Sequence, residues 1–286
     1  MTATTNTTDS LASDVADAPD QEADRHAIGT RHAARRQKRI PLHRLVWVEA
    51  TKMFDTRAGF WLLAAIGILA VLATASVIAF APDAAIAYNS FAPAVGIPMS
   101  VILPIIAILS VTSEYGQRTA LSTYTLVPRR GRVILAKAIV TLLIGVVGML
   151  VALGVAALGN LVGAAITGVD LVWDTNAQEL AQVVLANVLG MAVGFMLGVV
   201  IRNSPGAIVG YFVYSLVLPA IFGTLAVFQD WFADLQPWVD VNFAISRLFE
   251  TTMTAEYWSH LGVTSLLWIV LPLAIGLRML LRSEVK

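Results

Sequence analysis

The 286-residue sequence contains no cysteine, and this absence excludes a disulfide framework, a thiolate metal site and a cysteine nucleophile. Charged residues are scarce as well: they make up 13% of the chain, whereas an ordinary soluble domain has about 25%. Neither the four histidines nor the carboxylates show the spacing of a metal site. A GxxxxGK[ST] phosphate-binding loop and an HExxH pair are also missing. We therefore expect no catalytic residue, no bound cofactor and no metal in this chain, and no binding of nucleic acid.

Apolar residues are abundant: they make up 57% of the chain, and the mean hydropathy is +0.75. A soluble core of this length cannot enclose so much apolar surface, whereas a bilayer can, and about 20 apolar residues are enough to cross it. Six apolar runs have about this length, at residues 60–80, 91–111, 133–158, 180–201, 207–228 and 260–281. Their central parts lack charge, and Lys137 is counted with the connection before the third run. The pattern predicts an all-α polytopic membrane protein without a proton relay.

The chain before the first run divides into a polar tail and an amphipathic segment. Residues 1–24 are acidic and residues 25–44 are basic, so we predict a disordered cytoplasmic tail over 1–39 and a six-helix membrane domain over 40–286. Residues 41–58 carry apolar side chains at the three-and-four spacing of one helix face, namely Leu42, Leu45, Val46, Ala50, Met53 and Phe54. We expect a connecting helix in the membrane interface, and Glu49, Lys52 and Arg57 argue against its burial in lipid.

Lys and Arg are distributed very unevenly between the two sides of the predicted membrane domain. With the N-terminus inside, six crossings place 18 of the 19 Lys and Arg residues on the inner side and leave only Arg247 outside. Because Lys and Arg concentrate in cytoplasmic segments, this distribution predicts that both termini are cytoplasmic. The outer segments are mostly acidic, and the last of them, residues 229–260, is rich in aromatic residues. That segment is predicted to form short helices that either dip into the outer interface or cap an exit path.

Glycine and proline residues in the spans predict where helices pack closely and where they bend. Gly190, Gly194 and Gly198 stand four residues apart in the fourth run, a spacing that lets another helix approach closely, within the subunit or across a subunit interface. Pro93, Pro98 and Pro104 interrupt the second run, and Pro219 and Pro272 interrupt the fifth and sixth, so we expect kinks or local unwinding at these positions.

The segment from Thr112 to Lys137 is the sizeable polar, basic connection between the second and third runs. Composition alone leaves two interpretations open: basic anchors that fix the topology, or a docking element for a partner. Its residues resemble the cytoplasmic loop of ABC-2 type ABC transporter permeases, which reads Glu, an aromatic, a few polar residues, Thr, a short helix, Pro, Arg and Lys. The matching residues are Glu114, Tyr115, Thr119, Leu126, Pro128, Arg130 and Lys137. Glu49, Lys52 and Arg57 resemble the family's connecting helix, whereas Arg118 stands where many members have Gly.

The resemblance implies the ABC-2 exporter permease fold and a plasma-membrane location. It also implies a second permease subunit, in a homodimer or heterodimer, and a separate ATP-binding subunit that holds ATP and Mg. The loop would be the coupling helix that docks on this ATPase. The residues assigned to coupling are Glu114, Tyr115, Gln117, Arg118, Thr119, Leu121, Tyr124, Pro128 and Arg130. We expect residues 117–126 to dock and Glu114 to pair with Lys52 or Arg57.

The leading functional prediction is a permease subunit that exports a drug-like, peptide or lipid-like molecule. An ion-extruding ABC pump is an alternative within transport. A membrane assembly or signalling protein that transports nothing is an alternative of another class. A co-purifying ATP-binding protein would favour the exporter, and a chain that functions alone would favour the last alternative.

Overall fold

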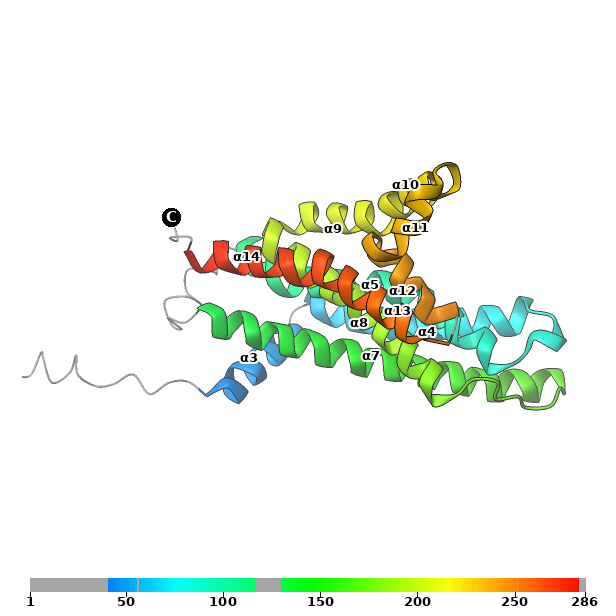
Figure 1. The fold of residues 1–286 in the computed structure, drawn as a ribbon. Helices are drawn as coiled ribbons and strands as arrows, with labels where there is room; N and C mark the ends of the chain where they lie inside the picture. The colour runs from blue at the N-terminus through cyan, green and yellow to red at the C-terminus, as the bar shows by residue number, and fades with distance from the viewer. Residues whose placement is uncertain (1–40, 56, 117–129, 251, 283–286) are drawn as a thin grey trace, which may run out of the picture. The chain divides into compact units, whose positions relative to one another are not determined.

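The computed structural model describes residues 41–55, 57–116, 130–250 and 252–282, and the predicted tail over 1–39 lies outside this part. Across the described ranges the secondary structure is helical and contains no β-strand (Figure 1). Six helices there are long and apolar enough to cross a membrane. They are Gly59–Phe80, Tyr88–Ser113, Gly131–Thr167, Ala177–Ile201, Ser204–Phe228 and Ala255–Arg282. These helices confirm the predicted fold class, an all-α membrane protein with six spans.

The first half of the chain forms the connecting helix and the first four spans. These helices are α3 (Leu42–Asp55), α4 (Arg57–Phe80), α5 (Tyr88–Gly116), α7 (Arg130–Thr167) and α8 (Ala177–Ile201). α5 packs against α4, α7 and α8. Its fully buried face consists of Phe91, Val95, Met99, Leu103 and Ile106, which recur at the spacing of one helix face. The second span is therefore the centre of the core.

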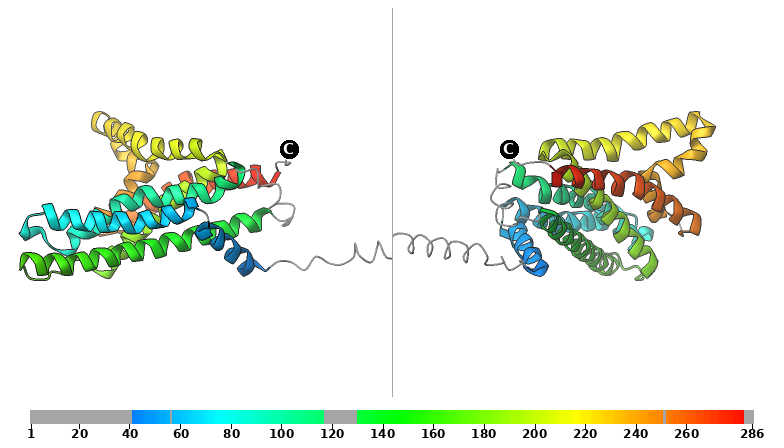
Figure 2. Two further views of the ribbon diagram at one scale, coloured as in Figure 1. Left: turned by 180° about the vertical axis from the view of Figure 1, so that it is seen from behind. Right: turned by 60° about the vertical axis from the view of Figure 1, so that its left-hand side comes forward.

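The second half contains the last two spans and the two short helices between them. Its elements are α9 (Ser204–Phe212), a π-helical turn (Val213–Val217), α10 (Leu218–Phe228), α11 (Asp230–Val239), α12 (Val241–Glu250), α13 (Ala255–Ser265), a second π-helical turn (Leu266–Val270) and α14 (Leu271–Arg282). α9 and α10 lie at the edge of the bundle (Figure 2). Many of their side chains are apolar and exposed, which suits a face in contact with lipid.

The two π-helical turns explain how proline is accommodated in the last two spans. Pro219 follows the first turn and Pro272 follows the second. A proline ring cannot donate to the carbonyl four residues earlier and clashes with it, and in both spans that residue lies within the wide turn. The irregularity expected at these two prolines thus takes the form of one widened turn in each span, whereas Pro93, Pro98 and Pro104 lie inside α5, which continues through them as one helix.

The corner between α11 and α12 reaches the middle of the last two spans. Trp268, in the second π turn, donates its indole N–H to the carbonyl of Val239 at 2.6 Å. Asn242 donates its side-chain amide to the carbonyl of Tyr214, in the first π turn, at 3.1 Å. Both π turns lie about halfway along their spans. The corner of the aromatic-rich segment therefore contacts the last two spans near the middle of their length, and the choice between the two arrangements expected for the segment stays a prediction.

Asp240 is buried at this corner, where only 2% of the residue is exposed. Its Oδ1 accepts the backbone N–H groups of Asn242 at 3.0 Å and Phe243 at 3.2 Å, so it caps the start of α12. Its Oδ2 accepts the side-chain amide of Gln236 at 3.1 Å. Sequence reasoning counted Asp240 among the outer acidic residues and missed this buried carboxylate.

Candidate coupling region at the junction of α3 and α7

The connecting helix α3 lies beside the start of α7 and also packs against α4 (Figure 1). One face of α3 points into the bundle and includes Leu45 and Met53, which belong to the predicted apolar face. Glu49 stands four residues from each of them, so it shares that face. Only 7% of Glu49 is exposed. A carboxylate is thus buried where the helix pattern calls for an apolar side chain.

Lys137 of α7 is the buried counter-ion of this carboxylate. Its Nζ lies 2.6 Å from Glu49 Oε2, and its side chain is 4% exposed. A second lysine, Lys52, reaches Glu49 Oε1 at 2.8 Å from the same helix, but its side chain is 43% exposed. Taking two charges out of water costs several kcal/mol each, about as much as close pairing returns, and either charge left alone would be strongly destabilising. The pair therefore holds α3 and α7 in one relative position.

In the sequence, the predicted coupling residues lie between α3 and Lys137, which form the two sides of this junction. Glu114 and Tyr115 lie in the last turn of α5, and Tyr115 is half-buried against the core. Arg130 is the first residue of α7. The other predicted coupling residues, Gln117, Arg118, Thr119, Leu121, Tyr124 and Pro128, lie outside the described residues. The structure thus describes both ends of this region: α5 leads into the loop, and α7 leads out of it.

The structure describes both residues that were expected to pair with Glu114, namely Lys52 and Arg57. Lys52 has a carboxylate partner within α3, namely Glu49. Arg57 is the first residue of α4, ahead of the first span, which begins at Gly59. The pairing of Glu114 with either of these residues stays a prediction.

Hydrogen bonds between small polar side chains join the helices near the same end of the bundle. The hydroxyls of Thr112 in α5 and Ser204 in α9 lie 2.7 Å apart. Thr141 in α7 donates to the hydroxyl of Ser110 in α5 at 3.0 Å. Side-chain hydrogen bonds therefore join the end of α5 to both α7 and α9.

The glycines of the fourth span lie along the contact between α8 and α5. A Cβ atom on Gly194 would stand 2.5 Å from the carbonyl oxygen of Pro104, and one on Gly198 would stand 3.2 Å from that of Ile108. A Cβ on Gly190 would stay 3.7 Å from the nearest atom. Two of the three positions thus need glycine for a close approach within the subunit.

The described contacts at the junction are an ion pair and hydrogen bonds between hydroxyls. Within the described part of the chain, no three or more His, Asp or Glu side chains gather so that they could hold a metal ion. The ion pair and the hydroxyl bonds join helices instead. The sequence did contain a signal for the pair: Glu49 lies on the apolar face of its helix, and Lys137 lies inside an apolar run.

Comparison with known proteins places the chain in a family. A model of the ABC-2 family transporter proteins matches residues 2–285, which is nearly the whole sequence. No curated protein matches the chain.

Proposed function

The chain belongs to the ABC-2 transporter family, and we propose that it is the permease subunit of an exporter driven by a separate ATP-binding subunit. In this proposal it lies in the plasma membrane with both termini in the cytoplasm. The segment from Thr112 to Lys137 couples it to the ATPase. The charge distribution of the sequence supports this orientation, because it places nearly all Lys and Arg on the side of that segment.

The observation that carries the proposal is the buried pair between Glu49 and Lys137. Lys137 lies two turns after the start of α7, the helix into which the loop leads. An ATPase that pushed on the loop would move the start of α7, and the ion pair would move α3 with it. A rigid-body displacement at one end could then be transmitted along the spans.

We further propose that a second permease subunit covers α9 and α10 and that the transport path runs beside them and α5. Support comes from a groove of about 680 Å³ on this edge, lined mostly by apolar residues. Thr224 is one of its few polar residues, and its hydroxyl already donates to the carbonyl of Ala220 in its own helix. Such a lining suits a drug-like, peptide or lipid-like cargo with a large apolar surface.

The docking proposal is tested by replacing Arg118 and Tyr124 together with alanine. The permease and the co-purified ATP-binding protein are reconstituted in lipid, and substrate-stimulated ATP hydrolysis is measured beside transport. We expect the double variant to lose substrate stimulation, because the loop no longer engages the ATPase. Replacing Arg129 and Arg132 with glutamine is the matched control, since topology alone explains these basic residues.

If the Arg118 and Tyr124 variant assembles and transports like the wild type, the docking proposal is wrong. A chain that carries out its function without any ATP-binding partner would contradict the exporter proposal itself.

A further inference from the structure

Spans five and six are built alike. Each contains a π-helical turn, and each turn leads into the sequence Val-Leu-Pro, at residues 217–219 and 270–272. In the first turn the N–H of Leu218 donates to the carbonyl of Val213, five residues earlier, and the second turn has the same bond. The next residue in each span is a proline, which has no N–H to continue this pattern. Helices bend sharply at prolines and at π turns, so each span has one place where it bends easily.

The two π turns lie beside each other. The ring of Tyr214, in the first turn, contacts the ring of Trp268, in the second, with their centroids 5.9 Å apart. If the bonding of the first turn continued, the carbonyl of Tyr214 would accept from residue 219, but Pro219 has no N–H. The side-chain amide of Asn242 donates to that carbonyl instead, at 3.1 Å. The two turns thus define one axis across both spans, and the corner between α11 and α12 supports it.

The four helices between the two turns are joined to one another by aromatic contacts. The ring of Phe222 in α10 contacts that of Phe232 in α11, with centroids 5.6 Å apart. The ring of Trp238 in α11 stands edge-on to that of His260 in α13, with centroids 4.3 Å apart. α12 packs against both α11 and α13. We call α10, α11, α12 and α13 the four-helix module.

The other halves of these spans, α9 and α14, are held by the first four spans. Tyr211 in α9 donates its hydroxyl to the carbonyl of Ser100 in α5 at 2.7 Å. α14 approaches α8 closely, since a Cβ atom on Gly276 would stand 2.9 Å from Cγ2 of Val200. Beyond the first π turn, by contrast, α10 contains no buried residue. The chain is therefore fixed on one side of each turn and less constrained on the other.

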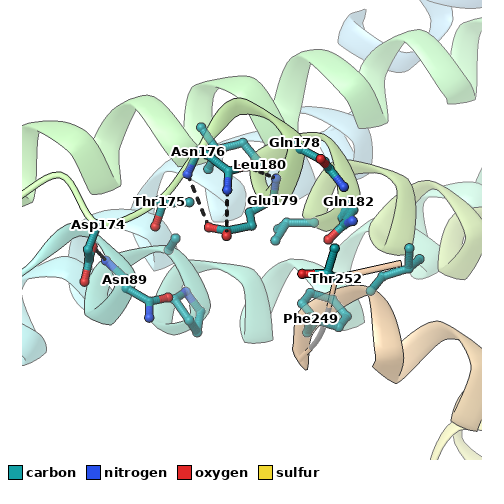
Figure 3. Close-up of a pocket in the computed structure, with 14 residues that line it drawn as sticks. Asn89, Asp174, Thr175, Asn176, Gln178, Glu179, Leu180, Gln182, Phe249 and Thr252 are labelled. Atoms are coloured by element: carbon teal, nitrogen blue, oxygen red, sulfur yellow. Dashed lines mark hydrogen bonds between the residues drawn. The ribbon is translucent and has the colours of Figure 1, made fainter. Parts of the chain in front are cut away.

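A pocket of about 530 Å³ lies between the module and the first turns of α5 and α8 (Figure 3). Leu248, Phe249 and Thr252 line it from the end of α12 and just beyond, and Asn89 and Glu179 line it from α5 and α8. The pocket leaves room for the end of α12 to move toward α5 and α8.

We propose that the four-helix module rocks as a rigid body on an axis through the two π turns, toward and away from the first turns of α5 and α8. α10 and α13 each have 11 residues, so their far ends lie about 16 Å from the axis. A rotation of about 15° displaces these ends by about 4 Å. In the transporter the movement opens and closes the path at this end of the bundle. That use rests on the proposed function, whereas the rocking itself needs no ATP-binding subunit.

Pairs of nitroxide labels measure the rocking in the full-length chain in nanodiscs, by double electron–electron resonance. The chain has no cysteine, so labels attach only to introduced cysteines, and an excess of the wild-type chain dilutes the labelled copies. L150C in α7 is the shared reference for A255C, at the start of α13, and for M279C, in α14; all three positions are exposed. We expect the 150–255 distances to spread over about 4 Å more than the 150–279 distances.

Variants assign the movement to the two turns. P219A/P272A gives each turn the missing N–H and should reduce the 150–255 spread to that of the 150–279 pair. P98A removes a proline of α5, away from both turns, so it is the matched control and should leave the spread unchanged. N242L removes the amide that donates to Tyr214 and should widen the spread. N242L tests the axis even if the proline double variant does not fold.

Equal spreads for the 150–255 and 150–279 pairs in the wild type would overturn the proposal. A pair within the module, L235C in α11 with A255C, should show the narrow spread of a rigid body, and a spread as wide as that of the 150–255 pair would overturn it too.

With the ATP-binding subunit added, ATP should shift the mean 150–255 distance by about 4 Å. An unchanged distance during measured transport would show that transport does not use the rocking. A chain that rocks but neither transports nor stimulates ATP hydrolysis would contradict the proposed function and leave the rocking in place.

Discussion

Among the described residues two carboxylates, Glu49 and Asp240, are buried, and they are stabilised in different ways. Glu49 is neutralised by Lys137, a cation 88 residues away on another helix. Asp240 has no such cation among its described contacts; it accepts two backbone N–H groups of α12 and the amide of Gln236, all within four residues. The first arrangement joins distant parts of the chain, whereas the second shapes one corner.

Because of this difference, we expect the two sites to respond differently to substitution. Loss of a counter-ion leaves a full charge buried in an apolar region, and no local rearrangement replaces the missing cation. Loss of a capping carboxylate leaves backbone and amide donors unpaired, which costs less because each of them is a dipole and not a full charge. We therefore expect the junction of α3 and α7 to be the more sensitive of the two.

The largest effect is expected for K137M, which leaves the Glu49 carboxylate buried without its main counter-ion. The stability of the fold should fall by about 3–5 kcal/mol. The measurement is the unfolding of the purified chain in detergent, followed by tryptophan fluorescence.

The double variant E49L/K137M removes both charges and should recover much of this loss, because it restores an apolar contact between α3 and α7. In the assembled transporter it should still hydrolyse ATP but couple it less well to transport. An additive loss of stability in the double variant would show that the two side chains do not act as a pair.

A smaller effect is expected for D240A, about 2 kcal/mol, since it removes a helix cap and leaves the amide of Gln236 unpaired. D240N keeps an oxygen at the same place and should cost less than about 1 kcal/mol. Equal losses for the two variants would mean that the negative charge, and not the cap, is what the corner requires. The same fluorescence measurement compares them.

The smallest effect is expected for K52A, which removes the exposed lysine that shares Glu49. A partly exposed ion pair contributes about 0–1 kcal/mol, because water and salt screen it. K52A and K137M thus compare two lysines on one carboxylate that differ chiefly in burial. A loss for K52A as large as that for K137M would contradict the role given to burial.

The six spans could be predicted because each depends on a local property, the length of an apolar run. The packing face of α3 was predicted for a similar reason, from the spacing of Leu45 and Met53. α7 is longer than its predicted run because Ala, Gly and Asn160 continue the helix past residue 158, and Asn160 donates from inside the bundle to the carbonyl of Val172.

The candidate sites were harder to predict because they depend on contacts between distant segments. The pairing of Glu49 with Lys137 needs α3 to lie on α7, and hydropathy does not contain that information. In the sequence, Asp240 is one of the acidic residues of an outer segment. Its burial follows from the structure, in which the corner between α11 and α12 contacts the two π turns.

The two π turns have a consequence for how the length of the last two spans can vary. Deleting one residue from an α-helix rotates everything beyond the deletion by about 100°, so side chains that faced lipid would face neighbouring helices. A π turn contains one residue more than an α-helical turn needs. Deleting a residue within Val213–Val217 or Leu266–Val270 would remove the widened turn and leave both halves of the span facing their present neighbours, at the cost of the clash that the turn avoids at Pro219 or Pro272. Spans five and six each contain one place where the chain can be shortened by a residue without turning the rest of the helix.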